Sequence, residues 1–400
     1  MNTGVVSRFS LPTEIIYGVN SVSMLGSELK KLGGKKAFFL TDAGVSASGI
    51  LEKAYAALND AGIPFTLFDK VPVDPTDKDI DGMVSAAKKE GCNCVIGAGG
   101  GSVIVATKGA ALGANNEGRT IEYVGGEDKY PNPSLLCAIM PTTAGSGAEV
   151  SKGTTITDSR TKKKARLLGY RHAVRLAILD PTLLTTVPKA QAVASGVDAL
   201  THAIEAYLSE KASPLTDCVA LKSIEMMMGS FRQSVFTIDM EAKGQMLLGS
   251  TMANVAVSNA TIGLSHILNG VLTYIYEKRG LEPMSYGMMH AVLLPPTLEF
   301  NLVACEEKVT PLAQAMGVIT HNKSLSELRE GIMESLDNLL TDLGAPSKLI
   351  WKDLSAEDIV DTGVQMGALS LDRAKQGVNV IRKYDKEDLV AILQKTLPEA

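Results

Sequence analysis

The clearest sign of how this chain folds is the stretch Cys94-Val95-Ile96-Gly97-Ala98-Gly99-Gly100-Gly101-Ser102. A short apolar run, typical of a buried strand, passes into a glycine-rich loop, and helical spacing follows from Val103 to Ala111. Glycines let a backbone approach a phosphate, and a helix N-terminus offers free N–H groups and a positive dipole end. The stretch therefore predicts a strand–loop–helix unit with a candidate phosphate site. A glycine turn without a ligand is the plain alternative.

Short apolar runs of the same kind recur on both sides of this unit. They are Lys36–Leu40, Phe65–Phe68, Leu135–Met140 and Leu176–Leu179, and helical spacing separates the first strands at 49–61 and 77–90. This alternation predicts parallel βαβ units with helices on both faces of one sheet. After Val187-Pro188 the chain changes to long Ala-, Leu- and Met-rich segments with helical spacing. We therefore expect an α/β domain over residues 1–185 and an all-helical domain over residues 186–400.

Composition argues against several classes of function. The 400 residues carry a formal net charge of −5, and the densest basic run, 160–166, is a candidate hairpin tip rather than a nucleic-acid-binding stripe. No apolar stretch reaches the roughly 18 residues of a membrane span, and the first residues lack the apolar core of a signal peptide. The five cysteines are scattered and odd in number. We expect reduced thiols and a cytoplasmic location, with no membrane or nucleic-acid partner.

A second candidate cofactor loop follows the strand at 135–140. It consists of Pro141-Thr142-Thr143-Ala144-Gly145-Ser146-Gly147 and is rich in hydroxyls and glycine. Because the carboxyl ends of parallel strands line one crevice, we expect both glycine loops to face the same ligand. Asp42 ends the strand at 36–40, where an acidic residue can bind both ribose hydroxyls and repel a 2′-phosphate, which favours NAD over NADP. A helix N-cap is the structural alternative for Asp42, and one residue can fill both roles.

A candidate metal site lies in the run Ser195-Gly196-Val197-Asp198-Ala199-Leu200-Thr201-His202. Four residues advance a helix by about 400°, so Asp198 and His202 share one face, one turn apart. An exposed ion pair or a satisfied core histidine is the plain alternative. The apolar neighbours instead indicate a largely buried helix, where charges are normally paired or metal-bound. With His266, which lies inside another apolar helix, the pair makes a two-histidine, one-carboxylate set that suits Fe²⁺.

Taken together, these motifs resemble the iron-containing (group III) alcohol dehydrogenase family. The resemblance implies an α/β dinucleotide-binding domain, an all-α C-terminal domain in the two-domain plan of dehydroquinate synthase, and a divalent metal in the cleft between them. It also implies NAD(P)-linked interconversion of alcohols and aldehydes, with a homodimer as the usual smallest assembly. The matching blocks run in the same order along nearly the whole chain: Phe9–Gly18, Thr41-Asp42, Asp74-Pro75, Gly99–Ser102 with Lys108, Pro141–Gly147 with Glu149-Val150, Leu179–Pro181, Gly196–Glu205, Gly263–His266, and Leu293–Pro295 with Glu299–Asn301.

The resemblance further implies the residues of the site. Asp198, His202 and His266 fall on three of the family's four metal-ligand positions, for Fe²⁺ or alternatively Zn²⁺. Asp42 falls on the ribose position. The other implied cofactor contacts are Asp74, Gly99, Gly100, Gly101, Ser102, Thr142, Thr143, Ser146 and Lys164.

The fourth ligand position departs from the family pattern. Tyr286 stands in Ser285-Tyr286-Gly287 where a ligand histidine is expected, and His290 follows one helical turn later on the same face. Metal-free maleylacetate reductases, which the family pattern also includes, carry a histidine at the place of His290 but lack the aspartate that Asp198 represents. We therefore expect a retained metal, with His290 as the replacement ligand or as the general acid–base.

Other departures concern proton transfer and substrate choice. Gly270 replaces a histidine often credited with proton transfer, and Val105 replaces an aspartate in the Gly-rich block. Residues 277–286 form an unusual polar insertion that we expect beside the substrate. Of the remaining histidines, His172 and His321 are expected at the surface.

The sequence thus predicts an NAD(H)-dependent oxidoreductase that interconverts an alcohol and an aldehyde or ketone by metal-assisted hydride transfer. A divalent cation makes this chemistry accessible because it stabilises the alkoxide of an alcohol that hardly ionises at neutral pH. The first alternative is a metal-independent NAD(P)H reductase of an oxo or unsaturated acid, similar to maleylacetate reductase. A lyase similar to dehydroquinate synthase and a non-catalytic nucleotide-binding scaffold are the others.

Overall fold

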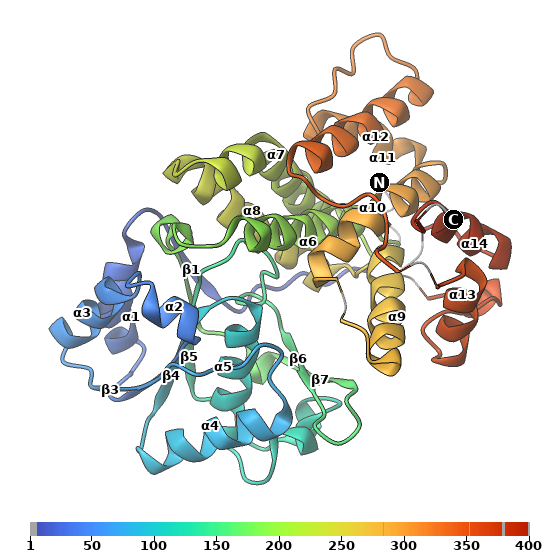
Figure 1. Ribbon diagram of the computed structural model, residues 1–400. Coiled ribbons are helices and arrows are strands. Elements are labelled where there is room, and N and C mark those ends of the chain that lie inside the picture. Colours follow the sequence, from blue (N-terminus) through green and yellow to red (C-terminus); the bar gives the residue numbers. More distant parts are fainter. Residues whose placement is uncertain (1–5, 283, 352, 378–380, 399–400) are drawn as a thin grey trace. The chain divides into compact units, whose positions relative to one another are not determined.

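The computed structural model describes residues 6–282, 284–351, 353–377 and 381–398. Two compact units divide the chain. The first, here called the sheet unit, comprises Ser10–Pro188 and Ile238–Thr251. The second, here called the helical unit, comprises Lys189–Thr237 and Met252–Ala400 together with the N-terminal segment up to Phe9. The two units are coloured along the sequence in Figure 1.

The sheet unit is built on six parallel strands, of which the apolar runs predict five, all but the strand Glu14–Tyr17. In spatial order they are β1 (Glu14–Tyr17), β8 (Leu176–Leu179), β5 (Leu136–Pro141), β4 (Cys94–Gly99), β2 (Ala37–Leu40) and β3 (Phe65–Phe68). The chain leaves β2 toward β3 and then returns to β4 on the other side, so the order reverses between β2 and β4. Ligands of open parallel sheets bind at such a reversal, beside the carboxyl ends of the strands.

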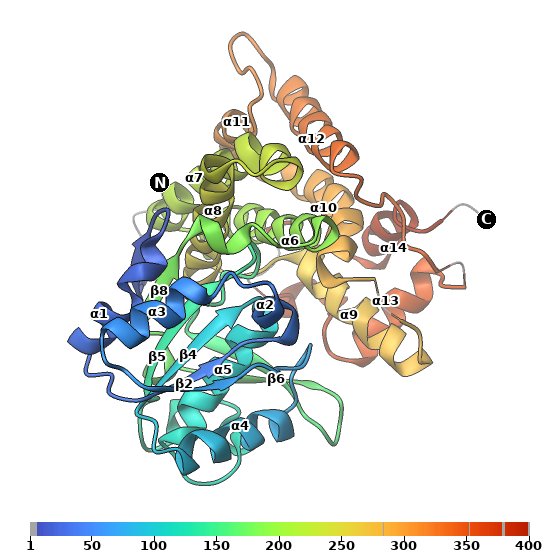
Figure 2. The same ribbon diagram turned by 60° about the vertical axis from the view of Figure 1, so that its left-hand side comes forward.

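Helices cover both faces of this sheet because its strands are apolar on both sides. Phe38 of β2 packs in one cluster with Met83 and Ala106, which belong to the helices α4 and α5. Its neighbour Phe39 points the opposite way and meets Tyr55 of α3 at 5.2 Å between ring centres. The helices of the unit are α1 (Leu25–Lys31), α2 (Ala43–Ala47), α3 (Glu52–Asp60), α4 (Asp77–Lys89) and α5 (Gly101–Ala114), shown around the strands in Figure 2.

The basic run at 160–166 belongs to an antiparallel hairpin, as expected. Its strands are β6 (Gly153–Thr157) and β7 (Lys164–Leu168), so Lys164 begins a strand. The turn residues 160–163 are exposed.

The helical unit confirms the all-helical prediction, since its described residues contain no strand. Residues from several helices form its core, among them Val271, Leu293, Ile359 and Leu389. No single helix in the described chain is long and apolar enough to cross a membrane, and only a sharply bent pair, α8 with α9, meets such a criterion by length and composition. The helices are α6 (Lys189–Tyr207), α7 (Pro214–Phe236), α8 (Met240–Asn259, whose residues up to Thr251 belong to the sheet unit), α9 (Leu264–Arg279), α10 (Tyr286–Leu302), α11 (Glu306–Ala315), α12 (Leu325–Asp342), α13 (Ala356–Gln365) and α14 (Lys386–Gln394).

Candidate metal and dinucleotide sites

The two glycine loops of the sheet unit lie against each other. Gly100 is the N-cap of α5, and the backbone N–H of Thr142 donates to the carbonyl oxygen of Gly99 at 3.1 Å. A Cβ on Gly100 would lie 3.5 Å from the Thr143 hydroxyl, and one on Gly101 would lie 3.6 Å from that of Ser146. Free N–H groups at the start of α5 and three hydroxyl-bearing residues therefore share one small region, which suits a phosphate.

Asp42 lies at the carboxyl end of β2, beside the reversal of strand order. One of its carboxylate oxygens accepts a hydrogen bond from the Val45 N–H at 2.9 Å and so caps α2. The preceding Thr41 hydroxyl donates to the Ala98 carbonyl at 2.7 Å, which joins the ends of β2 and β4. Asp42 therefore acts as a helix N-cap through one carboxylate oxygen, and its second carboxylate oxygen remains available for a ribose.

Three of the sequence-predicted cofactor residues meet at one point of the sheet unit. Lys164 forms an ion pair with Asp74, and the Asp74 N–H donates to the Ser102 hydroxyl at 3.1 Å. Thr157, which the sequence did not single out, donates to Asp74 at 3.2 Å and accepts from Lys164 at 3.0 Å. Asp74 has a φ of 53°, a left-handed conformation that is unfavourable without such partners. These contacts link the hairpin to the start of α5.

Two buried ionisable residues, Lys108 and Glu149, lie beside the segment that follows the second glycine loop. The Lys108 ammonium is fully buried and donates to the carbonyls of Ser151 and Gly153 at 2.8 and 2.7 Å. Glu149 is also buried and accepts from the Thr251 hydroxyl at 2.6 Å. Burial lowers the pKa of Lys108 to about 8 and raises the pKa of Glu149 above its ordinary value. Lys108 therefore holds the backbone that follows the loop.

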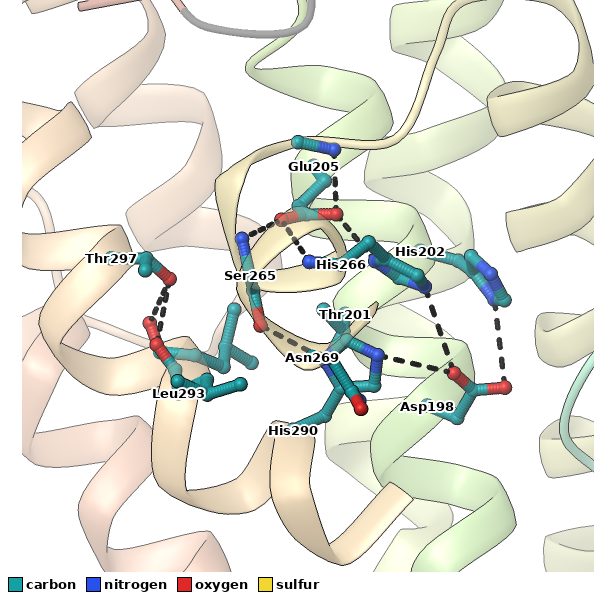
Figure 3. Close-up of polar contacts among 12 residues, drawn as sticks. Asp198, Thr201, His202, Glu205, Ser265, His266, Asn269, His290, Leu293 and Thr297 are labelled. Atoms are coloured by element: carbon teal, nitrogen blue, oxygen red, sulfur yellow. Dashed lines mark hydrogen bonds and ion pairs between the residues drawn. The ribbon is translucent and has the colours of Figure 1, made fainter. Parts of the chain in front are cut away.

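The helical unit brings together the four sequence-predicted metal ligands (Figure 3). Oδ1 of Asp198 lies 3.7 Å from Nε2 of His266 and 3.6 Å from Nε2 of His290. On the other side, Oδ2 of Asp198 lies 4.0 Å from Nδ1 of His202. The ligand atoms of Asp198, His266 and His290 all lie within 4.8 Å of one another, a group that does not include His202. His202 instead stacks on the His266 ring, 4.5 Å between centres.

The donor set fits a divalent cation. Oδ1 of Asp198, Nδ1 of His202, Nε2 of His266 and Nε2 of His290 are all buried and lack a hydrogen-bond partner. Buried polar atoms are rarely left so, and four in one cluster need an explanation. Two nitrogen or oxygen ligands bound to one cation at about 2.1 Å lie at most about 4.2 Å apart, and Oδ1 of Asp198 lies within that limit of Nε2 of both His266 and His290, whereas His202 comes within it only from the other oxygen, Oδ2. Imidazole and carboxylate suit Fe²⁺ and Zn²⁺.

Electrostatics distinguish the three imidazoles. Burial lowers the pKa of His202 to about 4 and that of His290 well below its ordinary value. Burial opposes a charge on His266 too, but Glu205 and Asp198 outweigh it and raise the pKa of His266 to about 9. Although burial alone would raise the pKa of Asp198, the surrounding histidines hold it well below the usual range. The carboxylate is thus ionised, and two of the imidazoles are neutral at pH 7.

Two further residues of this centre were missed from the sequence as functional groups. Glu205 of α6 lies 2.6 Å from Nδ1 of His266, and the Ser265 hydroxyl lies 2.8 Å from Nδ1 of His290. A signal for Glu205 was present, because it follows His202 by three residues on the same buried helix. Nothing in the spacing pointed to Ser265.

Tyr286 stands beside the cluster rather than in it. It is the first residue of α10, 46% exposed, and its ring contacts the His290 ring edge-on at 5.0 Å between centres. Gly270 of α9 is exposed, with nothing within 4 Å of an added Cβ. Of the polar insertion 277–286, Pro283 lies outside the described residues. The stretch 277–279 completes α9, which ends at Gly280 in a left-handed conformation.

The expected surface position is right for His321 but wrong for His172. His321 is exposed, whereas His172 is fully buried in the sheet unit. Its polar sequence neighbours suggested exposure, but Nδ1 of His172 lies 3.1 Å from the buried hydroxyl of Tyr130, and the two rings meet edge-on. A tertiary hydrogen bond thus meets one ring nitrogen of this buried imidazole, whereas Nε2 has no partner among the described residues.

Comparisons with known proteins agree along nearly the whole chain. Residues 12–181 match the family described as "Iron-containing alcohol dehydrogenase", and residues 192–397 match "Fe-containing alcohol dehydrogenase family, C-terminal". The 1,3-propanediol dehydrogenase of Citrobacter freundii is 33% identical over 353 residues, which are 88% of this chain and 89% of that protein. The lactaldehyde reductase of Escherichia coli (strain K12) is 30% identical over 389 residues, 97% and 99% of the two. The structure of an alcohol dehydrogenase from Oenococcus oeni matches with a TM-score of 0.87 at 28% identity, covering 98% of this chain and 100% of that one.

Proposed function

The chain belongs to the iron-containing alcohol dehydrogenase family and is an NAD-dependent oxidoreductase of alcohols and aldehydes or ketones, and from this premise we propose which of its residues hold metal and cofactor. One divalent cation is bound by Asp198, His202, His266 and His290. Fe²⁺ is the preferred ion, and Zn²⁺ is the alternative. The observation that carries this proposal is the cluster of three buried, unpartnered imidazole nitrogens around the ionised carboxylate of Asp198, whose Oδ1 is also buried and unpartnered. When bound, the cation stabilises an alkoxide or polarises a carbonyl, and the nicotinamide exchanges the hydride.

His290 takes the role that the family gives to a histidine at the position of Tyr286. Its support is geometric, since Nε2 of His290 lies 3.6 Å from Asp198 while its Nδ1 is engaged by Ser265. A ligand imidazole needs one free lone pair and one anchored nitrogen, and His290 meets both conditions.

Proton release takes place without the histidine that Gly270 replaces. The open space around Gly270 admits water, and the exposed hydroxyl-bearing ring of Tyr286 lies against His290. Water, the cofactor ribose, His290 or Tyr286 then carries the proton of the alcohol to solvent.

The dinucleotide binds to the sheet unit in this proposal. Its phosphates lie on the paired glycine loops, held by the N-terminus of α5 and the neighbouring hydroxyls, while Asp42 binds the adenosine ribose. Asp74 and Lys164 complete the site through the contact network with Ser102. The set is Asp42, Asp74, Gly99, Gly100, Gly101, Ser102, Thr142, Thr143, Ser146 and Lys164.

The broader setting is also part of the proposal. Residues 1–185 form the cofactor domain and 186–400 the metal and substrate domain. The protein acts in the cytoplasm as a homodimer or larger homo-oligomer. Its five unpaired cysteines support a reducing compartment. Short alcohols, diols and functionalised aldehydes are the substrates to try, because relatives are named for 1,3-propanediol and lactaldehyde.

The test is a coupled measurement of metal and hydride transfer. The purified protein is stripped with EDTA, reloaded with Fe²⁺ or Zn²⁺, and assayed for NADH formation from a panel of short alcohols and diols. We expect one metal per chain by elemental analysis, activity lost on stripping, and recovery on reloading. Full NADH-linked activity in the stripped protein would instead favour a metal-independent reductase with His290 as its acid–base group.

A further inference from the structure

Several hydrogen-bond donors surround the carboxylate of Glu205. It is 7% exposed and belongs to α6, one turn beyond His202. Its Oε2 accepts from the Gly263 N–H at 2.7 Å and lies 2.6 Å from Nδ1 of His266. Its Oε1 accepts from the N–H groups of Ser265 and His266 at 2.7 and 3.4 Å. Four donors from the beginning of α9 therefore converge on one side chain (Figure 3).

Two functions are combined in these contacts. Gly263 is the N-cap of α9 and has no side chain to satisfy the first N–H groups of the helix, so Glu205 does this from α6. The same carboxylate can only accept hydrogen bonds, so the proton of His266 must reside on Nδ1. Nε2, which faces Asp198 at 3.7 Å, is then the nitrogen that gives up its proton to bind a cation.

We propose that Glu205 is a positioning residue of the metal centre, which fixes the tautomer and direction of His266 and anchors the backbone of Ser265, whose hydroxyl holds His290. The inference rests on the proposed metal site and adds the group that orders two of its ligands. A carboxylate behind a ligand imidazole is a known way to orient the ring and increase its basicity.

The contacts explain why a glutamine would not serve. An amide in place of the carboxylate has one oxygen and one NH₂ group. In either orientation the NH₂ group faces at least one backbone N–H, of Gly263 or of Ser265, and two donors then oppose each other. If the NH₂ group faces His266, the imidazole must accept at Nδ1, which puts its proton on Nε2, where the cation binds.

The experiment uses Co²⁺ as the probe, bound to the full-length protein and followed by chelator competition and by the visible spectrum of the bound ion. We expect Glu205→Gln to weaken Co²⁺ binding by about 10- to 100-fold and to change the spectrum. Ser213→Ala, which removes the side-chain cap of α7 in the same unit, is the matched control and should lower Tm with no change in Co²⁺ affinity.

A second variant separates helix capping from imidazole positioning. In wild type a Cβ at Gly263 would lie 2.8 Å from Oε1 of Glu205, so a serine fits there only after Glu205 is shortened. The double variant Glu205→Ala/Gly263→Ser restores a side-chain cap to α9 but no partner for Nδ1 of His266. We expect its Tm to exceed that of Glu205→Ala while Co²⁺ binding stays weak.

Three results would overturn the inference. If Glu205→Gln binds Co²⁺ with wild-type affinity and spectrum, Glu205 does not position His266. If the double variant regains wild-type affinity, Glu205 is a helix cap only. If wild-type protein binds no Co²⁺, the proposed metal centre is wrong and the inference fails with it, which distinguishes this case from the other two.

Discussion

Replacing His290 with alanine tests whether this residue completes the metal centre. The binding free energy of a four-ligand zinc site is about 10–16 kcal/mol, so one ligand of four contributes roughly 2.5–4 kcal/mol, or a factor of about 10²–10³ in Kd. His290 is fully buried, and its Nε2 lies 3.6 Å from Asp198, about as close as Nε2 of His266. We therefore expect His290 to contribute a full ligand's share of the binding free energy. We predict that His290→Ala weakens Zn²⁺ binding by this factor.

The assay is chelator competition with Zn²⁺, combined with NADH formation by protein saturated with metal. His321→Ala serves as the control because His321 is exposed and outside both sites. Thermal unfolding of the stripped proteins separates lost ligation from a lost buried side chain. If His290→Ala binds Zn²⁺ normally but transfers hydride slowly, His290 is an acid–base group. Normal values of both would refute any role for it.

Three further predictions concern the cofactor, the packing and the pH dependence. Asp42→Ser should raise kcat/KM for NADPH relative to NADH by about tenfold or more without lowering Tm, since serine keeps the α2 cap while the charge that repels a 2′-phosphate is lost; an unchanged ratio would exclude Asp42 from ribose recognition. Gly287→Ala should destabilise the protein by about 1–3 kcal/mol or more, because its Cβ would lie 1.8 Å from the Ala194 carbonyl oxygen; a wild-type Tm would contradict this close approach of α10 to α6. Burial raises the pKa of Glu149, so the folded protein keeps the proton of this carboxyl group to a higher pH than the unfolded chain does. The contribution of Glu149 to the free energy of unfolding is therefore fully present below the ordinary pKa of about 4.3 and is lost as pH rises through the raised pKa. Glu149→Gln should reduce this fall of Tm with pH while keeping an acceptor for Thr251, and identical pH profiles would contradict the assignment.

The sequence predicted the central strands well because their residues are apolar on both faces. Strands such as β2 and β4 are continuous buried runs and need no partner to be recognised. The edge strand β1 was missed because its four residues are only partly buried and resemble a loop. Asp198 and His202 were found because they lie one turn apart on the same helix.

Residues whose roles depend on tertiary contact were harder to find. Lys164 is 90 positions from Asp74, and only the resemblance to a family placed both at the cofactor. Glu205 acts on a helix that begins nearly 60 residues later, so no local pattern reveals its partners. His172 shows the opposite error, since its polar sequence neighbours suggested exposure although the ring is buried, with Nδ1 beside the Tyr130 hydroxyl.

The position of Asp198, His202 and Glu205 on successive turns of α6 has a consequence for engineering. The backbone hydrogen bonds of one helix tie these three groups together, so none can shift without the others. His266 and His290 stand near the first turns of α9 and α10, and both helix starts are held against α6, by Glu205 at α9 and by the close approach of Gly287 to Ala194 at α10. Directed evolution toward new substrates should therefore leave α6 and the first turns of α9 and α10 unchanged, because libraries built on them should yield mostly inactive protein.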